Sequence, residues 1–364
     1  MERDTRDPLR AVIALHPTKS ECIAVALGDQ IRVRESSGVQ TVQVKQDSKA
    51  AADGAQKIIR SMVFSPDGAY LAAGGDDKML YLYKTDDWHM IHAFSSKKKI
   101  SSVSFSPSGE HIFAATKYGD VLVAPVLPDG NGSFSEMALL MGHFCSIITC
   151  LKVSRNNMWL ASCDREGKVR VTVIPSDPMQ GAHEIVSFCL GHEKFVSACA
   201  FVVPESGKEL ILSGGGDGLI KLWNPVDGHE MDSVDLGKPI LTLTSSVTQD
   251  LVFAVLDGSN EVSVLSVDDK NKLVRDSVLL EIPVVTGADT TAQGQAWFVG
   301  GPVGSESGLR VACMQRSGNT WEHVATHDSL SKLENCSKDD TPLFHSYLPE
   351  NLDKKRCKVT TQAM

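Results

Sequence analysis

The stretches VFSPDGAYLAAGGDDKMLYLY at residues 63–83 and FVVPESGKELILSGGGDGLIKLW at residues 201–223 share one pattern. A short β-prone run meets a turn such as SPDG at 65–68, an apolar run follows, and a Gly/Asp turn leads to an alternating run such as IKLW at 220–223. Pro presets φ, Asp bonds its own backbone and Gly accepts positive φ, so these residues favour turns. The pattern predicts strand, turn, strand, turn, strand in a small antiparallel sheet.

The same unit recurs along nearly the whole chain, with a period of roughly 45 residues that is typical of repeat folds. Further copies are SFSPSGEHIFAATKYGDVLVA (104–124), KVSRNNMWLASCDREGKVRVT (152–172), ALHPTKSECIAVALGDQIRV (14–33), SSVTQDLVFAVLDGSNEVSVLSV (245–267) and DTTAQGQAWFVGGPVGSESGLRVACM (289–314). Such a sheet cannot bury its faces alone, and radial stacking of four-stranded blades gives a β-propeller. The seven copies predict an all-β, seven-bladed propeller over residues 1–324.

The two ends of the chain carry separate predictions. We expect residues 8–14 or 40–46 to close the ring by pairing with the last blade, because closure removes exposed sheet edges. Residues 325–364 lose the alternating pattern and become polar, which predicts a flexible, partly disordered C-terminal tail. The start, MERDTRDPLR, has alternating charges and no apolar core, and no run approaches 18 apolar residues, so we expect a soluble, non-secreted chain.

Charge and cysteine usage narrow the functional classes. The net charge is −9, from 36 Lys plus Arg against 45 Asp plus Glu, so a nucleic acid is not expected as the sole partner. A local basic face remains open, with Lys97, Lys98 and Lys99 as its densest candidate. The nine cysteines are irregularly spaced without a C-x-x-C pair, which favours a reducing compartment, buried thiols and no metal site.

The copy at 191–223 contains Gly191-His192, Ser213, Asp217 and Trp223, and this spacing resembles that of WD repeats. The four polar side chains are expected to form a buried hydrogen-bonded chain that rigidifies the blade. A His-Ser-Asp set also suggests a hydrolase. A triad, however, needs an exposed Ser beside an oxyanion hole, whereas these residues fall at structural positions of the repeat.

The preceding copy departs from that pattern, because Glu166 stands in the place of Asp217 and Thr172 in the place of Trp223. Such a departure can mark a functional site. In its hairpin, Lys168 and Arg170 alternate with valines, so the cations face away from the apolar side and can hold carboxylates. The alternative is a solvated hairpin whose charges contribute little.

The segments SCDREGKVRV (162–171) and FCLGHEKFVS (188–197) resemble the signature region of the WD-repeat non-catalytic subunit of tRNA (guanine-N7-)-methyltransferase. Outside 142–223 the resemblance is mainly generic to WD repeats. The family often has Asp where Glu166 stands and an acidic residue where Gly167 stands, which puts individual ionic contacts in doubt. By resemblance, the residues that contact the catalytic subunit are Asp164, Arg165, Glu166, Lys168, Arg170 and Lys194.

The resemblance implies a scaffold that binds and stabilises a SAM-dependent catalytic subunit and helps hold tRNA for methylation of a variable-loop guanine. SAM belongs to the partner, because this chain has no glycine loop between a strand and a helix. Lys97–Lys99 and Lys117 are candidate tRNA contacts, with solvated loop lysines as the alternative. The basic cluster at 354–358 and the resemblance favour the nucleus, with the cytoplasm as a second compartment.

Two other functional classes compete with this interpretation. A generic WD-repeat adaptor, such as a ubiquitin-ligase substrate receptor, would use rim loops and would not need Arg165 or Arg170. An enzyme built on the propeller itself would need convergent acids or metal ligands around the central channel, and the sequence offers no such repeated ligand.

Overall fold

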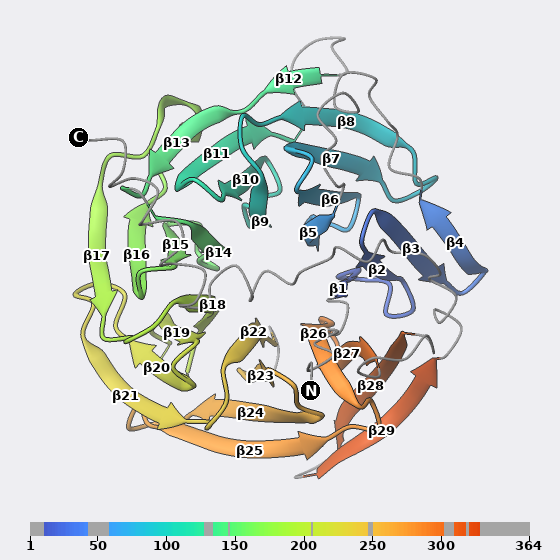
Figure 1. Cartoon of the computed structure of the whole chain (residues 1–364), viewed down its shortest axis with the longest axis vertical. Helices are drawn as coiled ribbons and strands as arrows, with labels where there is room; N and C mark the ends of the chain where they lie inside the picture. Colours follow the sequence, from blue (N-terminus) through green and yellow to red (C-terminus); the bar gives the residue numbers. More distant parts are fainter. Residues whose placement is uncertain are drawn as a thin grey trace, which may run out of the picture.

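The computed structural model describes residues 11–42, 58–126, 134–144, 146–204, 207–246, 250–301, 309–317 and 320–327. Seven sheets, each built on four antiparallel strands, are arranged in a ring around a central axis (Figure 1). Each sheet follows chain order from an inner strand at the axis to an outer strand at the perimeter. The prediction of an all-β, seven-bladed propeller is confirmed.

The strands are given from the inner to the outer edge of each blade. Blade 1 comprises β1 (Val12–Leu15), β2 (Ile23–Leu27), β3 (Gln30–Glu35) and β4 (Gly38–Val42), and blade 2 comprises β5 (Ile59–Phe64), β6 (Tyr70–Gly75), β7 (Met79–Lys84) and β8 (Met90–Ser95). Blade 3 comprises β9 (Ile100–Phe105), β10 (His111–Thr116), β11 (Asp120–Pro125) and β13 (Ala138–Gly142), and blade 4 comprises β14 (Ile148–Val153), β15 (Trp159–Asp164), β16 (Lys168–Val173) and β17 (Ile185–Leu190).

The remaining blades have the same layout. Blade 5 comprises β18 (Val196–Val202), β19 (Leu210–Gly215), β20 (Leu219–Trp223) and β21 (Glu230–Asp235), and blade 6 comprises β22 (Ile240–Ser245), β23 (Val252–Leu256), β24 (Glu261–Val267) and β25 (Leu273–Leu279). Blade 7 comprises β26 (Val284–Thr290), β27 (Gln295–Gly301), β28 (Arg310–Ser317) and β29 (Thr320–His327). A fifth strand, β12 (Phe134–Glu136), pairs in parallel with β8, and a 3-10 turn, η2 (Pro178–Gln180), joins β16 to β17.

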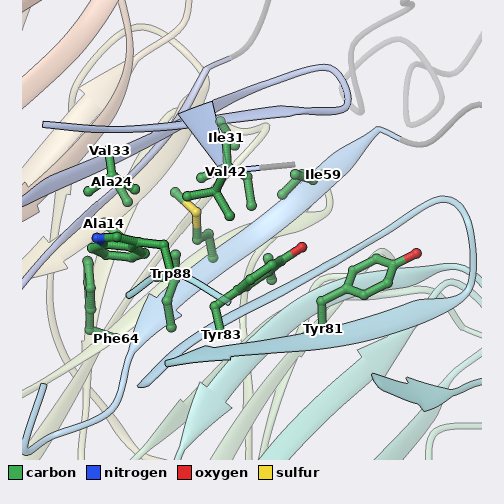
Figure 2. Packing of buried hydrophobic residues seen from close by; sticks show 14 of the residues in the cluster. Ala14, Ala24, Ile31, Val33, Val42, Ile59, Phe64, Tyr81, Tyr83 and Trp88 are labelled. Carbon is green, nitrogen blue, oxygen red and sulfur yellow. The ribbon is translucent and has the colours of Figure 1, made fainter. Parts of the chain in front are cut away.

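The apolar core lies between blades rather than within them. Figure 2 shows one such cluster, in which Ala14 and Val33 of blade 1 face Phe64, Tyr83 and Trp88 of blade 2. Equivalent clusters join the later pairs of blades. Because each sheet buries its faces only against its neighbours, a single blade would leave its apolar side chains in water.

A bulge recurs at one place in the inner strands and fixes the spacing of the blades. In blades 3, 4 and 5 the extra residue is Ser101, Thr149 or Ser197, each skipped by the pairing to the second strand. The hydroxyl of each donates to a backbone carbonyl in the inner strand of the next blade. A bulge re-aims its side chain, and here the hydroxyl satisfies a backbone acceptor across the blade boundary.

The ring closes without sharing a strand between its first and last blades, so the closure prediction is wrong within the described residues. β1 pairs with β2, and blade 7 takes all four strands from residues 284–327. Residues 8–10 and 43–46 lie outside the described ranges. Since blade 1 supplies four strands of its own, packing closes the seam, with Ile13 and Val25 against Val299. A hydrogen bond also crosses it, from the Leu15 N–H to Asp289 Oδ2 at 2.8 Å.

The last strand ends at His327, three residues beyond the boundary drawn from the sequence, and the rest of the expected tail lies outside the described residues. Cys22, Cys150, Cys163, Cys189, Cys199 and Cys313 are buried free thiols. Burial raises the pKa of Cys22, Cys189 and Cys313 to about 12. In the part of the chain that the structure describes, no helix is long and apolar enough to cross a membrane.

The seam contact yields a stability prediction. Asp289→Ala should lower the free energy of unfolding by about 1–3 kcal/mol, because it leaves the amides of Leu15 and Thr290 without their carboxylate acceptor. Denaturant unfolding monitored by circular dichroism measures this, with Asp269→Ala, at an exposed position, as the control. Equal stability of the two variants would show that the seam does not depend on Asp289.

Candidate partner-binding surface

Two kinds of connection meet on one face of the ring: the turn between the second and third strands of a blade, and the loop that leads into the next inner strand. Backbone hydrogen bonds join them, from Lys117 N to Lys99 O at 2.9 Å and from Arg165 N to Ile147 O at 3.0 Å. We call this the upper face. It carries every predicted contact region, namely Lys97–Lys99, Lys117, the 164–168 turn and the 191–194 loop.

Blade 5 contains the four-residue network that its sequence pattern suggested. Trp223 Nε1 donates to Ser213 Oγ at 2.7 Å, and His192 Nε2 lies 2.8 Å from the same oxygen. His192 Nδ1 lies 2.8 Å from Asp217 Oδ2. Ser213 is fully buried, so its hydroxyl cannot meet a substrate, and the network serves to hold the 191–194 loop against the turn.

Blade 4 builds an equivalent network from a different acid. His143 Nε2 lies 2.7 Å from Ser162 Oγ, and His143 Nδ1 lies 3.2 Å from Asp164 Oδ2. Glu166, which stands in the place of Asp217, is exposed. The sequence has Glu166 where blade 5 has Asp217, but Asp164, two residues earlier, takes over the hydrogen bond to the histidine. Asp164 can do so because it is the last residue of β15 and lies directly beneath the turn.

Asp164 is consequently a structural residue rather than a surface contact. It is 1% exposed, and its Oδ1 also accepts the backbone N–H groups of Glu166 and Lys168 at 2.9 and 3.0 Å. Burial alone would raise the pKa of Asp164, but the hydrogen bonds from His143 and from the Lys168 amide hold this pKa below its ordinary value. Because the Asp164 carboxylate is buried and already accepts these hydrogen bonds, it cannot contact a partner protein.

The other predicted contact residues of the turn and the neighbouring loop differ in how far their side chains are exposed to solvent. Glu166, Lys168 and Lys194 are exposed, and Arg165 is partly exposed beside Glu166, with 3.6 Å between their charged atoms. Gly167 has φ +85°, and a Cβ there would lie 2.7 Å from His192 O, so the turn packs closely on the 191–194 loop. An acidic residue at Gly167, common in the family that the sequence resembles, would push the two apart.

Arg170 is half-buried and bonded within the propeller. Its Nε donates to Thr172 Oγ1 at 3.0 Å and its Nη1 to Gly142 O at 3.0 Å, which joins β16 to the end of β13 in blade 3. Thr172 in turn donates to Met141 Sδ at 3.2 Å. Burial lowers the pKa of Arg170. Thr172, which stands where blade 5 has Trp223, is thus part of a contact between blades 3 and 4.

Sequence reasoning missed a group of exposed apolar side chains around these cations. Phe144 is 95% exposed, and Phe188 and Leu190 on β17 are 43% and 61% exposed. Leu190 pairs with Lys168 and Phe188 with Arg170, so these side chains share one face of the sheet. The available signal was Phe144 directly after Gly142-His143, where blade 5 has Glu193. We define the hairpin surface as Phe144, Arg165, Glu166, Lys168, Arg170, Phe188, Leu190 and Lys194.

The predicted tRNA-contact lysines lie apart from the hairpin surface, over blades 2 and 3. Lys99 and Lys117 form ion pairs with Asp76, whereas Lys98 lies over the ring of Tyr118 and Lys97 is exposed. Within the described ranges, no group of three or more His, Cys, Asp or Glu side chains has metal-binding geometry.

Comparisons with known proteins agree with this architecture. The family model described as "tRNA methyltransferase TRM82 WD40 domain" matches residues 18–137 and 130–286. The tRNA (guanine-N(7)-)-methyltransferase non-catalytic subunit wdr4 of Xenopus laevis is 34% identical over 223 residues, which cover 61% of this chain and 52% of that protein. The subunit of the same name from Dictyostelium discoideum is 26% identical, over 75% of this chain and 61% of that protein.

The chain thus spans about half the length of the first curated relatives it matches. Among solved structures, a chain of the "Crystal Structure of Mitotic Checkpoint Complex" aligns with TM-score 0.65 and 16% identity, over 82% of this chain and 92% of that one. The "Structure of U3-55K" aligns with TM-score 0.64 at the same identity, over 82% of this chain and 90% of that one. At this identity the likeness concerns the fold alone.

The two His–Ser–Asp networks predict a pH-dependent stability. Asp164→Asn and Asp217→Asn should each lower the free energy of unfolding by about 1–3 kcal/mol at pH 7, because a buried His loses its charged partner. Hydrogen bonds and charges lower the folded pKa of both carboxyls despite their burial. Their contribution is therefore present above the unfolded value of about 3.9 and is lost as the pH falls through the folded pKa.

Denaturant unfolding at pH 7 and near pH 3 checks this prediction. The difference between the wild type and each variant should shrink at the lower pH. Asp269→Asn, at an exposed position, is the matched control. A deficit of equal size at both pH values would contradict the assigned role of the ionised carboxylates.

Proposed function

Because the chain belongs to the family of the tRNA methyltransferase TRM82 WD40 domain, we propose that it is the non-catalytic scaffold subunit of a heterodimeric tRNA (guanine-N7-)-methyltransferase. The propeller binds and stabilises the SAM-dependent catalytic subunit and helps hold tRNA for methylation of the variable-loop guanine. Two relatives that carry the non-catalytic name support this role. SAM is held by the catalytic partner, and the nucleus is the proposed compartment, with the cytoplasm as a second.

The hairpin surface is the observation that carries the proposal. Exposed Phe188 and Leu190 lie beside the cations of Arg170 and Lys168, and exposed Phe144 follows His143, which bonds Asp164 beneath the same turn. Binding energy at interfaces concentrates in aromatic and Arg side chains that become fully desolvated, and charge fixes the choice of partner. The surface therefore fits a protein that presents an apolar patch edged by carboxylates.

The hairpin surface is also rigid before the partner arrives. The His143 and His192 networks hold the loops on both sides of the 164–168 turn, and Arg170 ties β16 to blade 3. A preorganised surface loses less conformational entropy on binding. A guanidinium has five N–H donors, so Arg170 keeps donors for a partner carboxylate after its two internal bonds.

The charge of the hairpin surface is tested first. Arg170→Glu should abolish partner binding while the chain still folds, and Lys168→Glu should weaken binding at least tenfold, because each places a carboxylate against carboxylates. Co-expression with the catalytic subunit, followed by calorimetric titration, measures the loss. Lys270→Glu, in the β24–β25 connection on the opposite face, is the control. A folded Arg170→Glu chain that binds normally would refute the interface.

The apolar part of the surface is tested by Phe144→Ala. The expected loss is about 2 kcal/mol of binding free energy, roughly thirtyfold in affinity, as for aromatic residues that fill a partner's pocket. Stability should not change, because Phe144 is 95% exposed. Val226→Ala, 59% exposed on the opposite face, is the control. Unchanged affinity for Phe144→Ala would remove this side chain from the interface.

The assignment as a methyltransferase subunit is tested by activity. Affinity purification of the chain should yield a class I methyltransferase in a 1:1 complex, and N7 methylation of tRNA guanine should require both purified chains. Recovery of ligase components, with no methyltransferase and no dependence of tRNA methylation on this chain, would favour the adaptor alternative.

A further inference from the structure

Three cysteine thiols meet in the core between blades 4 and 5. Cys150 comes from the inner strand β14, Cys163 from β15 of the same blade, and Cys199 from the inner strand β18 of blade 5. All three belong to the buried cluster that joins these blades, and each thiol is hydrogen-bonded to the other two. Among the residues that the structure describes, no group of three such ligands has metal-binding geometry, so oxidation is the chemistry left to these thiols.

Cys150 and Cys163 are placed to form a disulfide. They lie directly opposite each other in the antiparallel pair of β14 and β15, where opposed Cα atoms are roughly 4.5–5.5 Å apart. A disulfide joins residues whose Cα atoms are roughly 4.4–6.8 Å apart, so this bond needs no large movement of the backbone. Thr149 fixes the place, because its hydroxyl lies 3.1 Å from Cys163 O and donates to Val196 O in blade 5.

The three thiols differ in reactivity. Hydrogen bonds from Cys163 and Cys199, helped by the charge of Lys152, hold the pKa of Cys150 well below its ordinary value despite burial. Burial raises the pKa of Cys163. Cys150 is 9% exposed, whereas Cys163 and Cys199 are fully buried. Thiols that react with peroxide combine a low pKa and access to solvent with a second cysteine nearby. Cys150 therefore reacts first, and Cys163 follows.

We propose that Cys150 and Cys163 form a reversible disulfide when the chain meets hydrogen peroxide. The Cys150 thiolate attacks one peroxide oxygen, the O–O bond breaks, and protonation releases the other oxygen as water, which leaves a sulfenic acid at Cys150. The Cys163 sulfur then attacks the Cys150 sulfur, the S–O bond breaks, and the hydroxyl leaves as water with the Cys163 proton. Two thiols are oxidised and one peroxide is reduced to two waters. A small dithiol restores both thiols by exchange.

The disulfide lies at the foot of the hairpin surface. Cys163 stands between Ser162 and Asp164, the two residues that hold His143 beneath the 164–168 turn. A bond from Cys163 to β14 fixes the strand from which that turn emerges. The consequence for partner binding rests on the proposed function: oxidation locks the turn, so the oxidised chain keeps the catalytic subunit at temperatures that release it from the reduced chain.

Peptide mapping and thermal unfolding of the full chain test the disulfide. After treatment with hydrogen peroxide, free thiols are blocked with N-ethylmaleimide during denaturation, and mass spectrometry without reduction should find Cys150 joined to Cys163. The melting temperature should rise by about 5 °C and return to its starting value with dithiothreitol. Cys150→Ala should lose both the bond and the rise. Cys22→Ala, which removes a buried thiol from blade 1, is the control and should keep both.

Free Cys150 and Cys163 thiols in the peroxide-treated wild type would overturn the proposal, as would a bond from Cys150 to Cys199 in place of Cys163. A rise in melting temperature that persists in Cys150→Ala would also overturn it. Retention of the catalytic subunit on heating is compared for the oxidised and reduced chains as a separate measurement. A partner lost on oxidation would refute the lock. If the disulfide forms with its rise in melting temperature but neither form binds a methyltransferase, the disulfide stands and the proposed function fails.

Discussion

No blade of this propeller can bury its own apolar faces, and the rest of the structure follows from that constraint. The largest fully buried side chains, among them Trp223, Tyr83 and Phe94, belong to clusters that join neighbouring blades. Each sheet must therefore sit at a fixed angle and height against the next. The inner-strand bulges meet this need, because their hydroxyls bond the neighbouring strand where a slip would break a hydrogen bond.

The same requirement explains why the upper face can act as a recognition surface. Loops between blades would ordinarily be mobile, but buried His–Ser–Asp networks in blades 4 and 5 anchor them to the sheets. Blade 4 lacks the strand Trp, and Thr172 and Arg170 instead bond across to blade 3. Blade 4 thus has no buried Trp at this position. It has instead the half-buried cation of Arg170, which lies beside exposed Phe188 and near exposed Leu190.

Charge is distributed unevenly over an acidic chain. The net charge of −9 would repel a polyanion at long range, yet Arg60, Lys99 and Lys117 are gathered within 3.4 Å of one buried carboxylate. Screening limits the reach of the overall charge to about 8–10 Å at physiological salt, so the local cations dominate at contact. A cluster of cations can thus form on one face of an acidic propeller.

The sequence by itself determined the repeat, the number of blades, the blade 5 network and the regions on the upper face, because turn residues and alternation are local properties of the chain. It misjudged ring closure, since whether blade 1 supplies its own four strands depends on pairing across the whole ring. It also placed Asp164 on the surface and overlooked Phe144, because spacing along the chain does not reveal which carboxylate lies beneath a turn. The tertiary structure alone decided which charges meet, as Lys99 and Lys117 meet at Asp76, because residues about 20 to 40 positions apart come together only when the blades are packed against each other.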